Sequence, residues 1–183
     1  MMAAMRICGA LKFAILMTLL QFDHCSYIRD YEDISKFYSS NARIQTLYTT
    51  MGTTECKYDK VTKRYSQKAE FKRHFSSGGT KRTLDLVGKF VNHRHIFEPA
   101  ELDTMDVEKK EGGYYSSERL LHSYYGDNCG IFSVTRNWGG RGNDYELRVK
   151  KGNNAHGKCY HKFISDTKKA GVFRKIKHCK LMQ

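Results

Sequence analysis

The sequence has 183 residues, a formal net charge of +13 and six cysteines. This length suits one domain with one core, and no linker, repeat or low-complexity tract divides the chain. The lysines and arginines are spread along the chain and match no RNA- or DNA-binding signature, so nucleic acid is not an expected partner. The basic surface is either simply solvated or attracts anionic cell surfaces and sulphated polysaccharides.

The N-terminal segment 1–26 is predicted to be a secretory signal peptide. Arg6 precedes its apolar stretch "ICGALKFAILMTLLQF", which contains Lys12. The polar "DHCSYIRDYED" comes directly after it. A membrane anchor is disfavoured because the stretch is short, close to the start and without a second hydrophobic segment behind it. We expect cleavage near Cys25 or Ser26, which leaves 27–183 as a single secreted domain with no transmembrane segment.

Four cysteines remain after cleavage: Cys56, Cys129, Cys159 and Cys179. An even number of cysteines in an oxidising compartment predicts two disulfides. Metal binding is disfavoured, since no pair has the C-x₂₋₄-C spacing of a structural zinc site. Four cysteines allow three pairings, and composition alone does not choose among them.

After a short helix over 31–40, with Ile34, Phe37 and Tyr38 at helical spacing, the pattern is mostly β. A C-terminal helix is predicted over 158–171, closed by Gly171, with an extended tail over 172–179. The eight predicted strands are 43–51, 55–62, 67–76, 80–91, 104–110, 115–125, 129–136 and 144–151.

Eight strands joined by short hairpins can close into an antiparallel barrel, which removes exposed sheet edges. A barrel of this size has room inside for one small ligand. The alternation is imperfect in 67–76, whose two faces are Phe71, Arg73 and Phe75 on one side and Glu70, Lys72 and His74 on the other. Polar residues that point inward would suit a binding cavity, although a shifted register would give the same pattern.

The C-terminal half carries a specific order of residues: Cys129, Tyr145-Glu146-Leu147, Cys159, Lys162-Phe163, Phe173 and Cys179. Over about 114–179 this order resembles the tick salivary lipocalins, the histamine-binding protein family. The likeness is weaker over 31–113, where the strand pattern and Cys56 agree. The resemblance implies a lipocalin barrel with a C-terminal helix, and it implies the disulfides Cys56–Cys179 and Cys129–Cys159.

The same resemblance implies sequestration of a small host mediator, histamine or another biogenic amine, by carboxylates and aromatic rings inside the barrel. Glu146 matches the acid of the family's "YEL" motif. The apolar alternation of Tyr145, Leu147 and Val149 places Glu146 on the opposite face with Arg148. Spacing therefore favours an exposed Glu146, whereas the motif favours one inside the cavity.

Departures from the family pattern favour a second ligand class. Gly130 stands where amine-binding members often carry an acid, Lys81-Arg82 stand where an inward glutamate would open a strand, and Arg148 replaces a tryptophan. The loop "TTMGTTE" also lacks the aspartate and tryptophan of those members. Cations in place of acids would suit an anionic lipid mediator such as a leukotriene, a thromboxane or a fatty acid, which several tick lipocalins bind.

The candidate ligand-binding residues beside Glu146 are aromatic or charged and lie on the predicted strands. We expect them to be Tyr48, Glu70, Phe71, Arg73, Arg82, Phe90, Tyr124 and Phe132, with Phe75, Lys81 and Arg119 as further candidates for lining or for pairing with a carboxylate. Each basic residue could equally be a solvated residue of the outer face.

No nucleophile–base signature occurs, so an enzyme is not predicted, and no cofactor is expected. The "HRH" of 93–95 lacks an evident third ligand, so no metal site is expected either. A cationic surface-binding protein, or a protein-binding effector that uses the loop around Trp138, remains an alternative function. We expect a monomer.

Overall fold

The computed structural model describes residues 32–77, 80–92, 102–136, 144–153 and 157–180, without the side chains of Ser76, Ser77 and Thr80. The predicted signal peptide, its cleavage site, the "HRH" segment and Trp138 lie outside the described residues.

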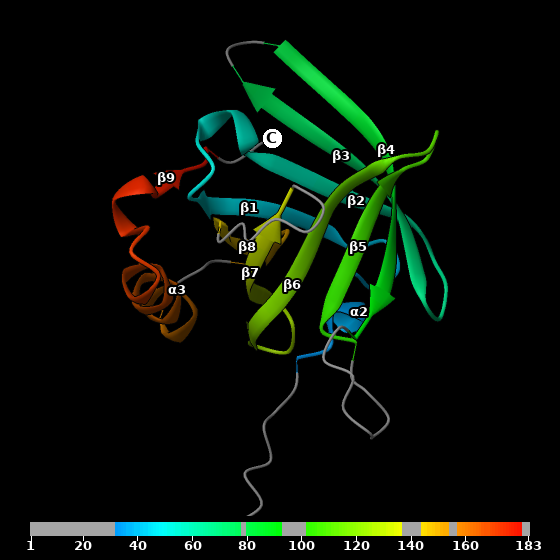
Figure 1. The fold of residues 1–183 in the computed structure, drawn as a ribbon. Helices are drawn as coiled ribbons and strands as arrows, with labels where there is room; N and C mark the ends of the chain where they lie inside the picture. The colour runs from blue at the N-terminus through cyan, green and yellow to red at the C-terminus, as the bar shows by residue number, and fades with distance from the viewer. Residues whose placement is uncertain (1–31, 78–79, 93–101, 137–143, 154–156, 181–183) are drawn as a thin grey trace, which may run out of the picture. The chain divides into compact units, whose positions relative to one another are not determined.

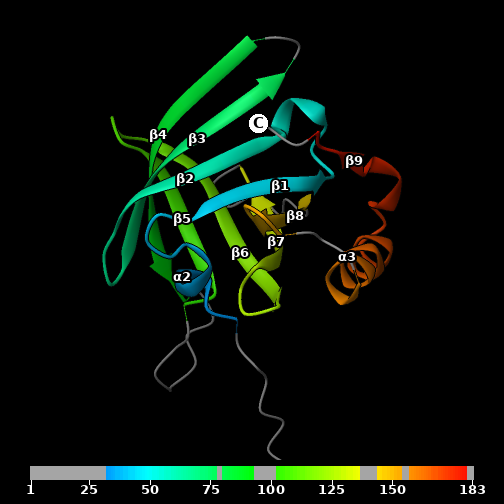
Figure 2. The same ribbon diagram turned by 180° about the vertical axis from the view of Figure 1, so that it is seen from behind.

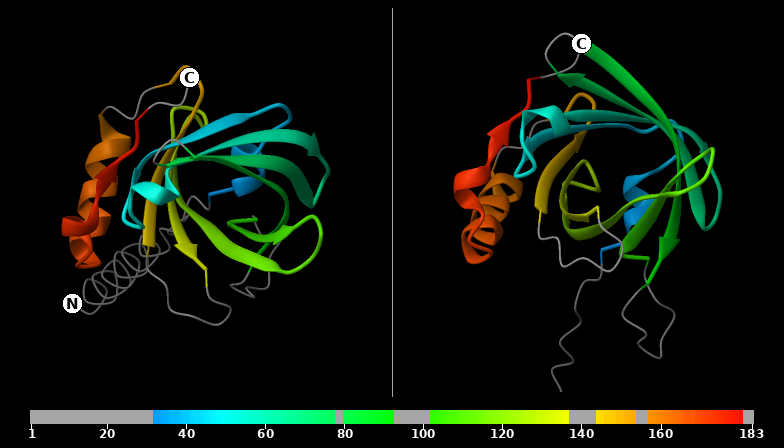
Figure 3. Two further views of the ribbon diagram at one scale, coloured as in Figure 1. Left: turned by 90° about the horizontal axis from the view of Figure 1, so that it is seen from above. Right: turned by 45° about the horizontal axis from the view of Figure 1, so that its top comes forward.

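The strands form a single antiparallel sheet that closes on itself. Its order is β2-β3-β4-β5-β6-β7-β8-β1-β9, and β1 pairs with β2 as well as with β8. The views of the ribbon show the closed barrel formed by β1 to β8 (Figure 1 and Figure 3). The strands are β1 Arg43–Thr49, β2 Lys57–Arg64, β3 Lys68–Ser77, β4 Thr80–Val91, β5 Thr104–Lys109, β6 Tyr114–Tyr124, β7 Cys129–Thr135, β8 Asp144–Lys150 and β9 Lys177–His178.

These bounds confirm the mainly β, eight-stranded barrel predicted from the sequence, with shifts of one or two residues at strand ends. The predicted N-terminal helix is shorter than expected. It is α2, Ile34–Phe37, whose first turn is capped by the carboxylate of Asp33, and Tyr38 leaves the helical region with φ −87° and ψ 50°. The predicted extended tail holds a 3₁₀ turn, η2 (Phe173–Lys175), before β9 pairs with β1.

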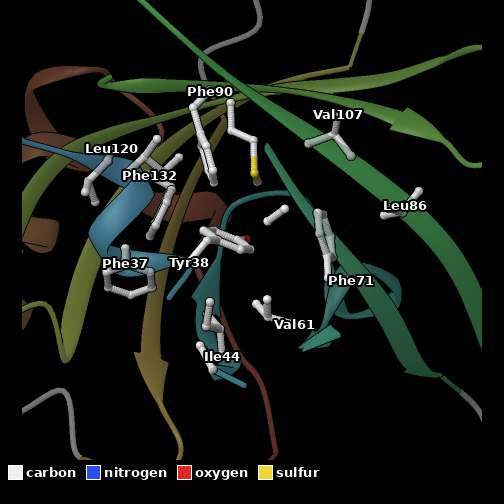
Figure 4. Packing of buried hydrophobic residues seen from close by; sticks show 14 of the residues in the cluster. Phe37, Tyr38, Ile44, Val61, Phe71, Leu86, Phe90, Val107, Leu120 and Phe132 are labelled. Atoms are coloured by element: carbon white, nitrogen blue, oxygen red, sulfur yellow. The ribbon is translucent and has the colours of Figure 1, made fainter. Parts of the chain in front are cut away.

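The apolar core inside the barrel lies around α2, which closes one end. Ile34, Phe37 and Tyr38 are fully buried, and the Ile34 amide donates to the Leu102 carbonyl at 2.9 Å. Around them lie inward-pointing strand residues, of which Figure 4 shows the packing. The cluster also contains Ala42, Ile44, Val61, Ala69, Phe71, Leu86, Phe90, Met105, Val107, Leu120, Phe132 and Val134.

A second apolar cluster lies on the outside of the barrel, beneath α3 (Lys158–Lys169). The helix buries Cys159, Phe163 and Thr167, which are four residues apart, against the outer faces of β7 and β8. Seen from behind, α3 lies beside the barrel on the side of β1 and β8 (Figure 2). Among the described residues, no helix is long and apolar enough to cross a membrane.

Two disulfides fasten this outer layer. Cys129 of β7 is bonded to Cys159 of α3, and Cys56 is bonded to Cys179, which follows β9. They are the same two pairs that the sequence resemblance implies. Each link joins the C-terminal segment to a different part of the barrel, so the helix and the tail are held against the strands.

Candidate functional site

Six ionisable side chains are buried together inside the barrel. Strand alternation places them there, because residues two apart in a strand point to the same face. Lys57 and Asp59 precede the apolar Val61 on the inner face of β2, and Arg73 follows Phe71 on β3. The other three are Glu118 of β6 and Glu146 and Arg148 of β8, and all six are at most 1% exposed.

The cluster occupies the half of the interior that is farther from α2. The end of β2 near α2 is marked by Arg64, whose Nε donates to the Ser35 carbonyl at 3.4 Å. Lys57 lies at the other end of β2, next to the 3₁₀ turn η1, Thr53–Glu55. The interior therefore has an apolar floor by α2 and a charged layer towards η1.

Arg73 is the centre of this layer. Its Nε and Nη2 donate to the two carboxylate oxygens of Asp59 at 2.8 and 2.7 Å. Its Nη1 and Nη2 donate to the two oxygens of Glu118 at 2.7 and 3.2 Å. Such two-pronged pairing holds the planar guanidinium in one orientation. Arg73 therefore has little capacity left for a ligand.

Arg148 links Glu118 to the third acid, Glu146. Its Nη1 donates to Glu118 and, at 2.7 Å, to the Tyr38 hydroxyl, which in turn donates to Asp59 at 2.9 Å. Its Nε donates to Glu146 Oε2 at 2.8 Å. Its Nη2 lies 2.6 Å from that same oxygen but is not aligned to donate to it, so we count an ion pair there and no hydrogen bond.

Lys57 has the simplest environment of the three cations. Among the described residues its Nζ has one hydrogen-bond acceptor, Glu146 Oε1. An ammonium group has three N–H donors, so two remain for another partner. Burial lowers the pKa of Lys57 to about 8, although the carboxylate of Glu146 acts in the opposite direction.

The two glutamates and the two arginines of the layer keep their charges. Burial alone would raise the pKa of Glu118, but Arg148 and Arg73 outweigh it and hold that pKa well below its usual range. The pKa of Glu146 is lowered in the same way by Lys57 and Arg148 against the effect of burial. Burial likewise opposes charge on Arg73, yet Asp59 and Glu118 raise its pKa well above normal. With three cations and three carboxylates, the layer is formally neutral.

Tyr115 stands between this layer and the η1 end. Its ring lies under Arg73 and Arg136, whose guanidinium carbons are 5.6 and 5.0 Å from the ring centroid. Its hydroxyl is buried and has no hydrogen-bond partner among the described residues. Arg136 also pairs with Glu55 of η1. A buried hydroxyl without a partner is costly unless something occupies it.

Gly130 shows why an acid is missing from one expected position. A Cβ atom on this residue would lie 2.8 Å from the ring of Phe132 and 2.8 Å from that of Phe37. Real Cβ atoms essentially never approach so closely, so any side chain here would push apart the aromatic residues that close the barrel by α2. The packing of the aromatic residues at the α2 end of the barrel therefore requires a glycine at this position.

Five of the predicted ligand-binding residues lie inside the barrel. They are Glu146 and Arg73 in the charged layer and Phe71, Phe90 and Phe132 in the apolar part. Glu146 is completely buried, so the expectation from spacing that it faces water is corrected. The alternating residues Leu147 and Val149 belong to the outer cluster beneath α3, and the apolar face of β8 is therefore the outer one.

Three other predicted residues, Tyr48, Tyr124 and Glu70, lie on the outside of the barrel, which corrects their assignment to the interior. Tyr48 and Tyr124 pack against the outer cluster under α3. Glu70 is on the outer face of β3 and pairs with Lys110. Arg82 is exposed but lies opposite Phe75, on the inner face of β4, with its guanidinium carbon 4.4 Å from the Phe75 ring centroid. Of the further candidates, Phe75 is buried, Lys81 is exposed, and Arg119 pairs with Asp103 at 2.9 Å.

Sequence reasoning missed most of the charged layer. Only Arg73 and Glu146 were candidate site residues, whereas Lys57, Asp59, Glu118 and Arg148 were not, nor were the polar Tyr38 and Tyr115. A signal for Lys57 and Asp59 was present in "KYDKV", where Val61 shares its face with both of them. The pattern was ambiguous because Tyr58 on the other face is equally compatible with burial.

No protein-family model matches the chain, and no curated protein sequence matches it either. Solved structures do match. A serotonin complex of AM182 is 20% identical with a TM-score of 0.56, over 81% of this chain and 89% of that one. The siderocalin Ex-FABP is 9% identical with a TM-score of 0.57, over 78% of this chain and 95% of that one. The fold is that of a lipocalin.

A bovine odorant-binding protein, a deswapped triple mutant, also matches, at 12% identity and a TM-score of 0.53 over 79% of this chain and all of that one. At such identities the likeness concerns the lipocalin fold. The finer resemblance to tick salivary lipocalins stays a prediction. The charged layer, together with the Tyr115 hydroxyl that has no partner among the described residues, makes the barrel interior the candidate site.

Proposed function

We propose that this lipocalin binds a small, partly apolar molecule that carries a hydrogen-bond acceptor, a carboxylate above all, inside the barrel. The single observation that carries the proposal is the kind of hydrogen-bonding capacity left in the charged layer. Lys57 Nζ has two spare donors, Arg148 Nη2 is not aligned to any acceptor, and the Tyr115 hydroxyl is unpartnered among the described residues.

The carboxylates offer a guest much less. Glu118 already accepts from Arg73, Arg148 and, at 3.0 Å, the Ser116 hydroxyl. Asp59 accepts from Arg73 and Tyr38. A protonated amine would have to displace one of these donors, whereas an acceptor can bind to donors that are not in use. The hydrogen-bond inventory therefore favours an anionic lipid over an amine.

The rest of the interior suits the apolar part of such a ligand. Phe71, Phe75 and the Tyr115 ring lie beside the charged layer, and Arg73 stacks 5.3 Å from the Phe71 centroid. Burial of a hydrocarbon chain contributes about 25 cal/mol per Å² removed from water. In our proposal apolar burial supplies most of the affinity, and Lys57 fixes the orientation of the headgroup.

A biogenic amine is the second candidate, because one observation favours it. Glu146 points into the barrel, and its Oε1 is held by a single lysine, so an amine could take the place of the Lys57 ammonium. The similar AM182 structure holds serotonin. This candidate requires Lys57 to leave Glu146, which the carboxylate candidate does not.

One substitution separates the two candidates. Lys57→Met in the oxidised protein removes the anchor of a carboxylate and at the same time frees Glu146 Oε1 for an amine. We expect it to weaken binding of arachidonate by about 10- to 150-fold, the range for a hydrogen bond to a charged group. Lys60→Met is the matched control, since Lys60 is exposed on the outer face of the same strand.

Calorimetric titration with arachidonate, its methyl ester, histamine and serotonin measures the outcome. Tight binding of arachidonate by wild type, with loss in Lys57→Met alone, supports the proposal. Binding of histamine or serotonin by wild type without arachidonate binding would overturn it, and tighter amine binding in Lys57→Met would then identify Glu146 as the amine partner. No measurable binding of any of the four ligands would also overturn it, in favour of a surface-binding role.

We further infer that the protein is secreted and acts on a mediator outside the cell. Two disulfides support this, because such bonds persist in oxidising compartments. The apolar N-terminal stretch of the sequence supports it independently. Binding without chemistry, by a monomer, is the role that we propose for the barrel.

A further inference from the structure

The C-terminal segment Lys158–Lys180 holds much of the protein's excess charge. It contains eight basic residues and a single acid, Asp166, whereas the whole chain has 32 Lys and Arg against 19 Asp and Glu. Thus 23 residues supply more than half of the net charge of +13. The basic residues are Lys158, Lys162, Lys168, Lys169, Arg174, Lys175, Lys177 and Lys180.

Most of these cations have no counter-ion within the part of the chain that the structure describes. Lys162 pairs with Asp166 at 2.8 Å. The other seven are exposed and form no ion pair with any residue that the structure describes, although the Lys168 ammonium lies 5.2 Å from the Phe173 ring centroid. An array of uncompensated cations raises the local concentration of anions. The segment therefore carries the free positive charges needed to bind a polyanion.

The array is held in place rather than carried on a loose tail. Cys159 and Cys179 tie its two ends to β7 and to the residue before β2, and β9 pairs with β1. As Figures 1 and 3 show, α3 and the chain through η2 to β9 lie together on the outside of the barrel. A rigid array loses less conformational freedom when a partner binds.

We propose that this surface, the C-terminal cationic face formed by Lys158–Lys180, binds a sulphated polysaccharide chain. Helix α3 alone extends over about 18 Å at 1.5 Å per residue, so cations along it can follow several charged groups of a linear polyanion. Disulfides indicate an oxidising, extracellular environment, where sulphated polysaccharides are the expected linear polyanions.

A lipid surface fits this face less well. Membrane-lying helices bury an apolar face among the lipids. In α3, Cys159 and Phe163 are instead fully buried against the barrel, and Tyr160 and Ile164 are partly buried against the same cluster. Phe173, at 42% exposure, is the large hydrophobic side chain exposed within Lys158–Lys180. The face thus offers charge without the apolar surface needed for insertion.

The test uses the oxidised full chain and a heparin decasaccharide, measured by calorimetry at 0.05, 0.15 and 0.5 M NaCl. The test variant combines Lys168→Gln, Lys169→Gln, Arg174→Gln and Lys175→Gln. The matched control combines Lys60→Gln, Lys63→Gln, Lys68→Gln and Lys81→Gln, which removes equal charge from exposed positions on β2, β3 and β4.

We expect the test variant to bind heparin about tenfold more weakly and with a shallower salt dependence, because fewer counter-ions are released. The control should stay within about twofold of wild type, since its cations lie outside the C-terminal cationic face. Non-sulphated hyaluronan of equal length should bind much more weakly than heparin. Arachidonate binding should be unchanged in both variants, which keeps this proposal separate from the barrel's function.

Three results would overturn the proposal. The first is absence of heparin binding at 0.05 M NaCl. The second is an equal loss in the control variant, which would show that overall charge and no particular face is responsible. The third is tighter, variant-sensitive binding to vesicles of 70% phosphatidylcholine and 30% phosphatidylserine, which would assign the face to membranes.

Discussion

The two faces of β8 bury their side chains by opposite means. The outer face sends Leu147 and Val149 into an apolar cluster beneath α3, whereas the inner face sends Glu146 and Arg148 into a charged layer. These four side chains are almost completely excluded from water, with at most 2% exposure. In β8 the apolar stripe therefore marks the surface beneath the helix, and the charged stripe marks the interior.

The difference teaches that burial has different purposes on the two faces. Apolar contacts beneath α3 stabilise the fold without directional requirements. Buried ion pairs stabilise little in net terms, because the loss of hydration offsets their attraction, and they are sensitive to the loss of any one partner. We therefore expect changes in the outer layer to affect stability alone and changes in the charged layer to affect binding as well.

The largest effect should come from Glu118→Gln. Glu118 neutralises both Arg73 and Arg148, so its removal leaves excess positive charge in a fully buried place. We expect a loss of about 3–5 kcal/mol in the free energy of unfolding, measured with urea. Glu108→Gln, which breaks a half-exposed pair with Lys89, should cost at most about 1 kcal/mol. Equal losses would mean that the interior pairs are no more coupled than surface pairs.

The second test removes a link of the outer layer. The double substitution Cys129→Ala/Cys159→Ala opens a loop with a sequence separation of 30. We expect it to cost about 3 kcal/mol of stability while arachidonate affinity stays the same, because the disulfide lies outside the charged layer. Removal of the Cys56–Cys179 disulfide should also lower arachidonate affinity, since Cys56 precedes Lys57. An affinity loss with the first pair alone would contradict the separation of the two layers.

The third test titrates Lys57. Its pKa falls on folding from 10.5 to about 8, so the unfolded chain holds the proton more tightly and the destabilising effect of Lys57 shrinks as pH rises from 8 towards 10.5. Arachidonate affinity should fall roughly tenfold between pH 7 and 9 as the ammonium is lost. Lys57→Met should lack this pH dependence. A wild-type affinity that stays flat to pH 9.5 would exclude Lys57 as the anchor.

The smallest effect distinguishes two neighbouring tyrosines. Tyr115→Phe removes a hydroxyl without a partner among the described residues, so stability should not fall, while ligand affinity should drop by about 2- to 10-fold. Tyr114→Phe removes a hydrogen bond to the Thr135 carbonyl at 3.1 Å, so it should lower stability and leave ligand affinity unchanged. Thermal unfolding and arachidonate titration of both variants measure this, and the same response from both would remove Tyr115 from the site.

The barrel could be predicted from the sequence because each strand has a local residue pattern and is separated from the next by turn-forming residues. All eight barrel strands and α3 were located from pattern alone, and the order around the sheet follows from short hairpins. The short extent of α2 was not foreseen, since Tyr38 has helical spacing but turns its hydroxyl towards Asp59. That contact joins residues 21 apart and has no local signature.

The candidate site was predicted only in part, for a physical reason. Alternation fixes which residues share a face but does not say which face is inside. Glu146 and Arg148 were placed together, yet the side that they face depends on α3, which covers the apolar side. Asp59 lies directly opposite Arg73 in the neighbouring strand β2, but Glu118 comes from β6, and only closure of the barrel brings it to Arg73.

The disulfide between Cys56 and Cys179 has a consequence for proteolysis. Its two ends are 123 residues apart, so every peptide bond between them belongs to a covalent ring. A protease that hydrolyses one bond in this ring opens it without releasing a fragment. The nicked protein gains the mass of one water molecule, about 18 Da, and separates into pieces only after reduction. A single cut by a protease would thus leave the barrel strands and the C-terminal cationic face covalently joined.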